Sequence, residues 1–216
     1  MFNNFSDFLK KRLHAKSLPG QSSQFMMAPE PAGQEGSTRR MDAPDEAHVS
    51  SVLILIFPNE ASQLSLLLTL RSQDINHGGQ ISLPGGRAES GETPVETALR
   101  EAREEIGITA GEVEIAGNLS DLYVAYSNNR VTPVVGFLDT PPELNINHDE
   151  VKEAFTVALD SLLDDENLII ENWTLRDKAT YKVPYWDVHQ VPLWGATAMI
   201  LSELLELYRE FKAQKT

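Results

Sequence analysis

The chain of 216 residues contains no cysteine, and its basic residues are few. Without cysteine, neither a disulfide framework nor a thiolate zinc site can form. There are 18 Lys and Arg residues against 32 Asp and Glu residues, which gives a formal charge of −14. This charge argues against a nucleic-acid polymer as partner, because phosphate backbones need a basic surface. An anionic small molecule would have to be received by bound metal or by a few well-placed arginines.

Long hydrophobic runs are also absent, since no apolar segment approaches the about 20 residues that cross a bilayer. Residues 2–13 carry Phe and Leu on one side, which predicts a docked N-terminal helix. A transit peptide or membrane-surface anchor is the alternative, but Asp7 interrupts the apolar face. Residues 17–47 are rich in Ser, Gly, Pro and Gln and predict a surface loop or linker. We expect an N-terminal extension over residues 1–47, one domain over residues 48–216, and a cytoplasmic protein without a membrane partner.

Apolar and alternating segments in the second part predict strands, followed by further helices. The expected strands are Val52–Phe57, Leu64–Leu70, Val113–Leu119, Leu122–Tyr126, Val131–Leu138 and Glu153–Val157. We expect a short helix at Asp160–Leu163 and a polar hairpin or loop up to Val188. The pattern of Leu193–Phe211 predicts a long amphipathic helix. Its apolar face is expected to pack in the core, and a dimer surface is the alternative, so a homodimer is one interpretation. Strands flanked by helices on both sides predict an α/β/α sandwich.

The strongest helix signal lies between Thr93 and Gly107. Thr93 is placed to cap the helix, and Pro94 fits the first helical position, where a missing N–H costs nothing. Glu96, three residues after the cap, completes a capping box. Gly107 can take the left-handed conformation that ends a helix. The sequence therefore predicts a helix with both ends defined.

Three glutamates of this helix, Glu101, Glu104 and Glu105, stand at i, i+3 and i+4 and so share one face. Like charges at this spacing repel one another and weaken the bare helix slightly. A hard divalent cation such as Mg²⁺ or Mn²⁺ would turn this repulsion into binding. The alternative is a solvated acidic helix face.

The wider pattern decides between these interpretations. Its residues are Gly86, Glu92, Arg100, Glu101, Glu104, Glu105, Gly107 and Ile108. This spacing resembles the box of the Nudix hydrolase family, G-x5-E-x7-R-E-U-x-E-E-x-G-U, where U is a bulky aliphatic residue. Only Ala102, at the first U, departs from it, and that position concerns packing. The resemblance implies an α/β/α sandwich with a mixed central sheet and metal-dependent hydrolysis of a pyrophosphate bond in a nucleoside diphosphate-linked substrate.

The same resemblance implies roles for individual residues. Glu101 and Glu105 are expected to bind Mg²⁺ or Mn²⁺, with Glu104 as ligand or partner and the carbonyl of Gly85 as a further ligand. The residues counted as catalytic are Glu101, Glu104, Arg100 and Glu150. Arg100 is expected to pair with a box glutamate and to fix its orientation. Glu92 is expected to stabilise the junction between loop and helix, and its alternative is an ordinary surface charge.

The general base is left open between Glu104 and a carboxylate outside the box. In several Nudix enzymes a carboxylate on a later loop helps to hold metal or activates water. Asp149, Glu150 and Glu153 are the candidates here, with Glu150 first. Each of them is equally compatible with an ordinary charge at a strand edge.

The segment before the box resembles the signature of the coenzyme A pyrophosphatase branch, L-L-T-x-R-[SA]-x3-R-x3-G-x3-F-P-G-G. Leu67–Ser72 and Pro84–Gly86 match it, and Trp194–Ala198 also looks like this branch. Asn76 replaces the second arginine, Leu83 replaces Phe, and the spacing to the glycine is one residue short. These departures concern the selectivity for the phosphates of coenzyme A, for which an arginine fork is the natural receptor.

The resemblance implies that coenzyme A or an acyl derivative is cleaved to 3′,5′-ADP and (acyl-)4′-phosphopantetheine. The expected substrate-binding residues are Arg71, His77 and Gln80. The alternative for Arg71 is a structural ion pair, and the alternative for His77 is a loop residue without a role in binding. ADP-ribose or a nucleotide sugar is the alternative substrate. A Nudix-fold ligand-binding protein without catalysis is the alternative class, although such proteins typically lose box glutamates that are all present here.

Overall fold

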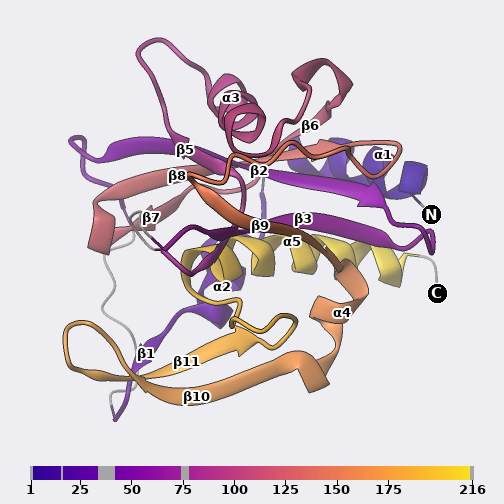
Figure 1. The fold of residues 1–216 in the computed structure, drawn as a ribbon. Coiled ribbons are helices and arrows are strands. Elements are labelled where there is room, and N and C mark those ends of the chain that lie inside the picture. Colours follow the sequence, from indigo (N-terminus) through magenta and orange to yellow (C-terminus); the bar gives the residue numbers. More distant parts are fainter. Residues whose placement is uncertain (1, 16, 34–41, 74–77, 215–216) are drawn as a thin grey trace.

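The computed structural model describes residues 2–15, 17–33, 42–73 and 78–214. A twisted central sheet separates helix α3 (Pro94–Ile106) on one face from helices α1 (Phe2–Leu13) and α5 (Gly195–Ala213) on the other (Figure 1). A smaller sheet lies beyond α5. The predicted α/β architecture is confirmed.

Among the described residues, the central sheet has eight strands. They are β2 (His48–Pro58), β3 (Leu64–Arg71), β4 (Ile81–Ser82), β5 (Gly85–Arg87), β6 (Glu114–Asn118), β7 (Leu122–Val124), β8 (Asn129–Phe137) and β9 (Val151–Ala158). Strands β2 and β8 pair in parallel, whereas β3 pairs antiparallel with β2, β4 and β9, so the sheet is mixed, as expected. Strand β3 is buried except at its last residue, and β2 is buried over most of residues 50–57, as their continuous apolar sequences predicted.

One predicted strand is shorter in the structure, and the segment expected to be a hairpin or a loop is a hairpin. The strand expected at Leu122–Tyr126 ends at Val124, and the chain turns through a short 3₁₀ helix at Ala125–Ser127 with Asn128 in the left-handed conformation (φ 48°). The polar segment before Val188 is a hairpin of β10 (Leu168–Thr174) and β11 (Thr180–Trp186). The short helix α4 (Leu159–Leu163) precedes it.

Helix α3 has the predicted ends. The Thr93 hydroxyl accepts from the Glu96 N–H at 3.3 Å, and the Glu96 carboxylate accepts from the Thr93 N–H at 2.7 Å. Gly107 closes the helix with φ 78°. Ala102, the departure from the box, is fully buried in the hydrophobic cluster that α3 shares with the sheet. These contacts fix α3, and therefore its acidic face, against the sheet.

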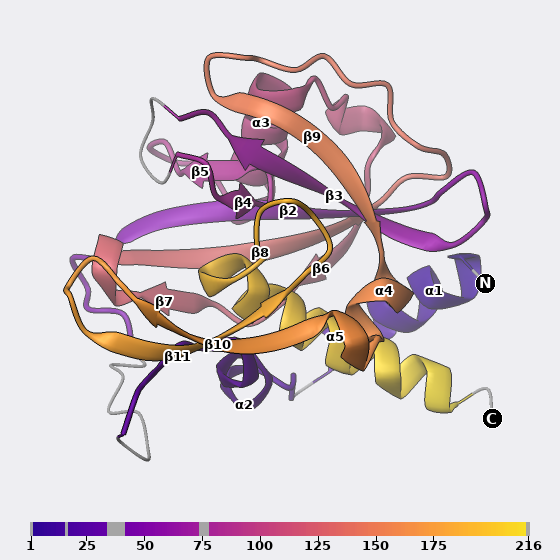
Figure 2. The same cartoon turned by 60° about the horizontal axis from the view of Figure 1, so that its bottom comes forward.

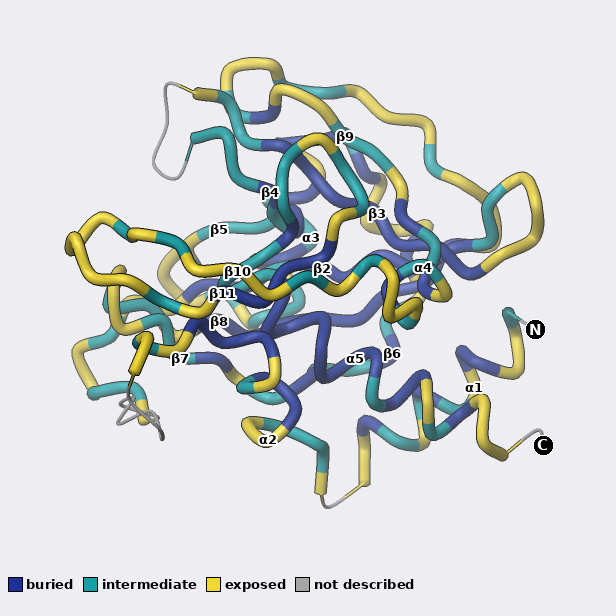
Figure 3. Tube along the Cα trace, turned by 90° about the horizontal axis from the view of Figure 1, so that it is seen from below, coloured by how far each residue is buried: buried dark blue, intermediate teal, exposed yellow. Residues whose placement is uncertain are grey.

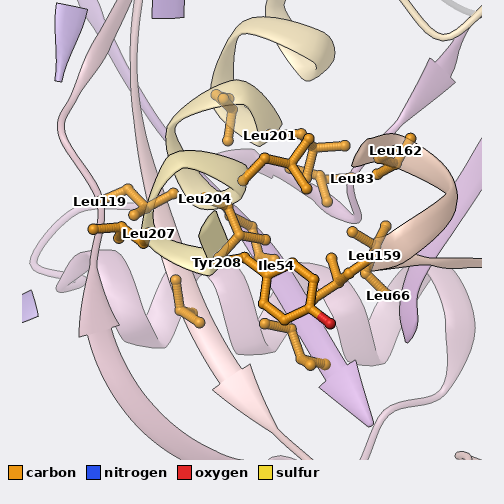
Figure 4. Close-up of a cluster of buried hydrophobic side chains, with 14 of the residues drawn as sticks. Ile54, Leu66, Leu83, Leu119, Leu159, Leu162, Leu201, Leu204, Leu207 and Tyr208 are labelled. Carbon is orange, nitrogen blue, oxygen red and sulfur yellow. The ribbon is translucent and has the colours of Figure 1, made fainter. Parts of the chain in front are cut away.

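The opposite face of the sheet carries the larger core. Figure 4 shows buried side chains of α5, among them Leu204 and Tyr208, beside Ile54 of β2 and Leu66 of β3. Helix α1 belongs to the same core, because Phe5 is fully buried in it. The docked N-terminal helix is thus confirmed, while the domain boundary at residue 47 stays a prediction. Within the described residues, no helix is long and apolar enough to cross a membrane.

The segment after α1 corrects the expected surface loop, because part of residues 17–47 is folded and buried. It forms α2 (Gln21–Gln24), a 3₁₀ helix at Phe25–Met27, and β1 (Glu30–Pro31), which pairs with β11. Figure 3 shows buried stretches within this segment, and the hairpin β10–β11 is mostly exposed or intermediate. The composition predicted a loop because the segment is rich in polar residues. In the structure, some of these polar side chains are buried.

A buried carboxylate explains how polar residues can pack there. Glu203 of α5 is fully buried, and it accepts hydrogen bonds from the Gly20 N–H at 2.9 Å and from Gln24 Nε2 at 3.0 Å. The Ser120 hydroxyl donates to it at 2.7 Å. The hydroxyl of Ser202, next in the helix, donates to the Ser23 carbonyl at 2.8 Å. This group of contacts fastens the N-terminal segment to α5.

We expect Glu203→Ala to lower the free energy of unfolding by about 2–4 kcal/mol, because it leaves several buried donors without an acceptor. Glu206→Ala in the same helix is the control: Glu206 is partly exposed and pairs with Arg209 at 3.2 Å, so its loss should cost about 0.5 kcal/mol or less. Denaturant unfolding of both variants measures this difference. Equal costs would show that the buried carboxylate does not hold the segment.

Candidate active site

Glu105 is the most enclosed of the three glutamates on α3, with 2% of its surface exposed. Its Oε2 accepts from the Gly85 N–H at 3.1 Å, and its Oε1 lies 3.7 Å from Nη1 of Arg71. Burial raises the pKa of Glu105 to about 7, although the Gly85 amide and Arg71 act in the opposite direction. Glu105 therefore joins α3 to the ends of β3 and β5.

Glu101 lies one turn earlier and packs directly on Gly86. A Cβ atom at Gly86 would stand 2.5 Å from both the carboxyl carbon and Oε2 of Glu101, so a larger residue at this position would have to displace the carboxylate from where it lies. Burial raises the pKa of Glu101, and the charges of Glu104 and Glu150 add to this effect, while Arg100 opposes it. The close approach of the Glu101 carboxylate is thus a physical reason for a glycine at position 86.

Arg100 connects the loop to the helix through several acids. Its Nε donates to Glu92 at 2.7 Å, and its Nη1 donates to Glu101 at 2.8 Å and to Glu104 at 3.1 Å. Its Nη2 donates to the Arg87 carbonyl at 2.9 Å. Hydrogen bonds from Arg100 are the main cause that lowers the pKa of Glu92 to about 2. The expected pairing of Arg100 with a box glutamate is present, and so is the contact of Glu92 at the loop–helix junction.

Of the three acids proposed beyond the box, Glu150 is the one whose charge acts on the α3 glutamates. Its negative charge raises the pKa of both Glu101 and Glu105. Glu150 itself accepts from Asn147 Nδ2 at 3.3 Å. Glu153 lies instead near His189, with 3.6 Å between its Oε2 and the ring Nε2. Although its loop is distant in sequence, Glu150 is thus near enough to α3 for its charge to act on Glu101 and Glu105.

These carboxylates suit a hard divalent cation in their chemistry. The charge of Glu150 disfavours the ionised forms of both Glu101 and Glu105, and the charge of Glu101 does the same to Glu105, which is the condition that a bound cation relieves. Within the part of the chain that the structure describes, no three or more His, Cys, Asp or Glu side chains are gathered closely enough to hold a metal as they stand. Instead, the carboxylates are engaged by Arg100, by Arg71 and by the Gly85 amide. Carboxylate oxygens are suitable ligands for such an ion. The ligand roles of the individual glutamates and of the Gly85 carbonyl stay predictions.

The residues predicted for substrate binding are only partly described. Arg71 and Gln80 both line a cavity beside the carboxylates. His77 and Asn76 lie outside the described residues. Trp194 and Ala196, in the second segment that resembles the coenzyme A branch, line the same cavity. Sequence reasoning missed the walls supplied by the N-terminal segment and by the hairpin β10–β11, because no motif marks them.

The fold and the site define an α/β protein with an acidic centre on one capped helix, and comparison with known proteins identifies its family. The family profile described as NUDIX domain matches residues 47–179, which is more than half of the chain. The chain therefore belongs to the NUDIX domain family. Nudix hydrolases generally use divalent metal ions.

Curated relatives place the chain within the family. It is 35% identical over 162 residues to Nudix hydrolase 3 of Caenorhabditis elegans, covering 66% of this chain and 66% of that protein. It is 41% identical over 115 residues to the mouse protein named peroxisomal coenzyme A diphosphatase NUDT7, covering 52% of this chain and 48% of the relative. The match therefore spans just under two thirds of one relative and about half of the other. The resemblance to the coenzyme A pyrophosphatase branch is confirmed.

A solved structure supports the fold. The crystal structure of the Nudix hydrolase RenU from M. smegmatis matches with a TM-score of 0.54 and 22% identity, and covers 78% of this chain and 87% of that one. At this identity the likeness concerns the architecture alone. The cytoplasmic location and the homodimer stay predictions.

Proposed function

We propose that this Nudix hydrolase cleaves the diphosphate of coenzyme A or acyl-coenzyme A, giving 3′,5′-ADP and (acyl-)4′-phosphopantetheine, with Mg²⁺ or Mn²⁺ as cofactor. The observation that carries the proposal is the position of Arg71, which lies 3.7 Å from the buried Glu105 and also lines the adjacent cavity. A cation between an acidic centre and a cavity is suited to receive a diphosphate. The relative named coenzyme A diphosphatase supports this choice of substrate.

In this proposal Glu101, Glu104 and Glu105, with the Gly85 carbonyl, hold the divalent ion. When bound, the ion neutralises phosphate oxygens and lowers the pKa of a water molecule. Arg100 keeps Glu101 and Glu104 in place, since it donates to both. Arg71 binds a non-bridging phosphate oxygen, and Gln80 binds the substrate beside it.

Glu150 is the proposed general base, and Glu104 is the alternative. Water adds to one phosphorus of the diphosphate while the carboxylate of Glu150 takes up its proton. The bridging P–O bond then breaks, and its electron pair stays on the leaving phosphate. Positioned acid–base groups of this kind typically contribute about 10²–10⁴-fold to the rate. The protonated carboxyl group returns its proton to solvent when the products leave.

Incubation with coenzyme A, ADP-ribose and nucleotide sugars under Mg²⁺ or Mn²⁺, followed by anion-exchange analysis of products, tests the function. We expect 3′,5′-ADP and 4′-phosphopantetheine, with kcat/KM for coenzyme A at least about 10-fold above the other substrates. No 3′,5′-ADP at any metal concentration would overturn the coenzyme A assignment. ADP-ribose is the second candidate, because Asn76 replaces an arginine that would receive the 3′-phosphate.

A further inference from the structure

A cavity of about 670 Å³ lies next to the carboxylate centre. Its walls come from segments far apart in sequence: α2 with the following 3₁₀ helix, β4, β7 with its following turn, the hairpin β10–β11 and the first turn of α5. Figure 2 shows the hairpin passing over α5 near β7. Arg71 joins the cavity to the centre, since it both lines the cavity and lies 3.7 Å from Glu105. A substrate whose diphosphate is bound at Arg71 therefore has one arm directed at this space.

The lining has balanced charge and is rich in aromatic and aliphatic side chains. Its charged members among the described residues are Arg71, Arg176, Asp121 and Asp177. Asp177 accepts from the Tyr181 hydroxyl at 2.6 Å, and Asp121 accepts from Thr132 at 2.7 Å. The aromatic and aliphatic members are Phe25, Ile81, Leu122, Tyr123, Val124, Tyr126, Val131, Leu175, Tyr181, Trp194 and Met199. This lining favours an uncharged chain over a phosphate group, which would need an excess of cations.

The wall formed by the N-terminal segment is held in place. Gln24 lines the cavity, is fully buried, and donates through Nε2 to Glu203 at 3.0 Å and to the Ser120 carbonyl at 3.1 Å. Farther along the segment, β1 pairs with β11 of the hairpin. The two walls are therefore linked to each other and to α5, so the cavity belongs to the folded structure.

We propose that this cavity binds the uncharged arm of the substrate, the acylated pantetheine chain, an inference that rests on the proposed function. Of the two arms of the diphosphate, the nucleotide arm carries a further phosphate, whereas the other consists of amide groups, methylenes and a thioester. The cavity volume of about 670 Å³ lies within the range of roughly 300–1,000 Å³ that is typical of small-molecule pockets in proteins. A pocket of this size can receive a flexible chain such as acylated pantetheine.

A series of acetyl-, butanoyl- and hexanoyl-coenzyme A tests the assignment, with the Ala196→Phe variant to narrow the cavity. Burying each added methylene should raise kcat/KM by up to about fourfold, so we expect at least about a 10-fold rise over the series. Ala196→Phe should reduce the rise to less than about threefold. Ala213→Phe, the same substitution at the exposed end of α5, is the control and should keep the wild-type rise.

Leu175→Trp narrows the same cavity from the hairpin side, and we expect it to reduce the rise in kcat/KM as Ala196→Phe does. With two variants, the test can still be made if one of them folds poorly. Unchanged chain-length dependence in both folded variants would overturn the assignment, as would its absence in the wild type. If the variants instead alter the discrimination between coenzyme A and dephospho-coenzyme A, the nucleotide arm occupies the cavity and the assignment is wrong. In all these cases turnover continues, so the proposed function stands.

Failure of the proposed function itself has a different result, namely no hydrolysis of any coenzyme A derivative. Calorimetric titration with S-hexanoyl-pantetheine, which has no diphosphate, then still tests the cavity without turnover. We expect binding by the wild type and by Ala213→Phe, and at least about 10-fold weaker binding by Ala196→Phe. No binding by the wild type, or equal binding by all three proteins, would overturn the assignment.

Discussion

We expect Glu105→Gln to lower kcat/KM by about 10³-fold or more while the fold stays intact. Glutamine keeps the shape of the side chain and an oxygen for the Gly85 amide, but it removes the negative charge that the proposed metal site needs. Removal of a charge from a nearly fully buried position does not cost stability, because burial disfavours the ionised form there. Steady-state kinetics with Mg²⁺ or Mn²⁺ measures the loss, and thermal unfolding without metal should give an equal or higher Tm.

Glu112→Gln is the matched control, because it makes the same charge change at an exposed position after α3. It should retain activity within about twofold. The metal-dependent rise in Tm is a second readout: at 100 times its dissociation constant, an ion that binds only the folded state adds about 2.7 kcal/mol. We expect this rise in the wild type and in Glu112→Gln, and its loss in Glu105→Gln. Wild-type turnover in a folded Glu105→Gln variant would contradict the ligand assignment.

The acidic helix could be predicted from sequence because its determinants are local. The capping contacts of Thr93 and Glu96 and the termination at Gly107 depend on residues within one turn of each helix end. The shared face of Glu101 and Glu105 follows from helical spacing alone. Glu150 is different, since only the folding of its loop brings its charge near α3. It had no stronger sequence signal than Asp149 or Glu153.

The cavity could not be predicted, because its walls depend on long-range polar contacts. Glu203 has no motif around it, yet its carboxylate binds Gly20 and Gln24 about 180 residues earlier in the chain. A segment rich in Ser, Gly, Pro and Gln indicates a loop when such a partner is unknown. The same contact that buries this segment also sets one wall of the proposed substrate site. Thus the chemistry follows from a local pattern, whereas the proposed selectivity for the substrate arm depends on tertiary structure.

Helix α1 should be as necessary to stability as the strands that follow it, and we expect Phe5→Ala to lower the free energy of unfolding by about 3–5 kcal/mol. Phe5 is fully buried, and its ring centroid lies 5.1 Å from that of Tyr208, 5.0 Å from Phe211 and 6.2 Å from Phe137. Its removal leaves a cavity between α1, α5 and β8, and the surrounding side chains can relax only partly. For a chain of this size the loss corresponds to a fall in Tm of about 10 °C.

Phe8→Ala provides the comparison, because Phe8 lies on the same helix and also packs on Phe211, at 5.5 Å between centroids, but is only partly buried. It removes the same atoms from a position that water can fill, so we expect at most about half the cost of Phe5→Ala. Denaturant unfolding gives both values. If Phe5→Ala costs less than about 1 kcal/mol, residues 2–13 are a separable extension. If the costs differ as expected, the folded domain includes this helix and the boundary predicted at residue 47 is wrong.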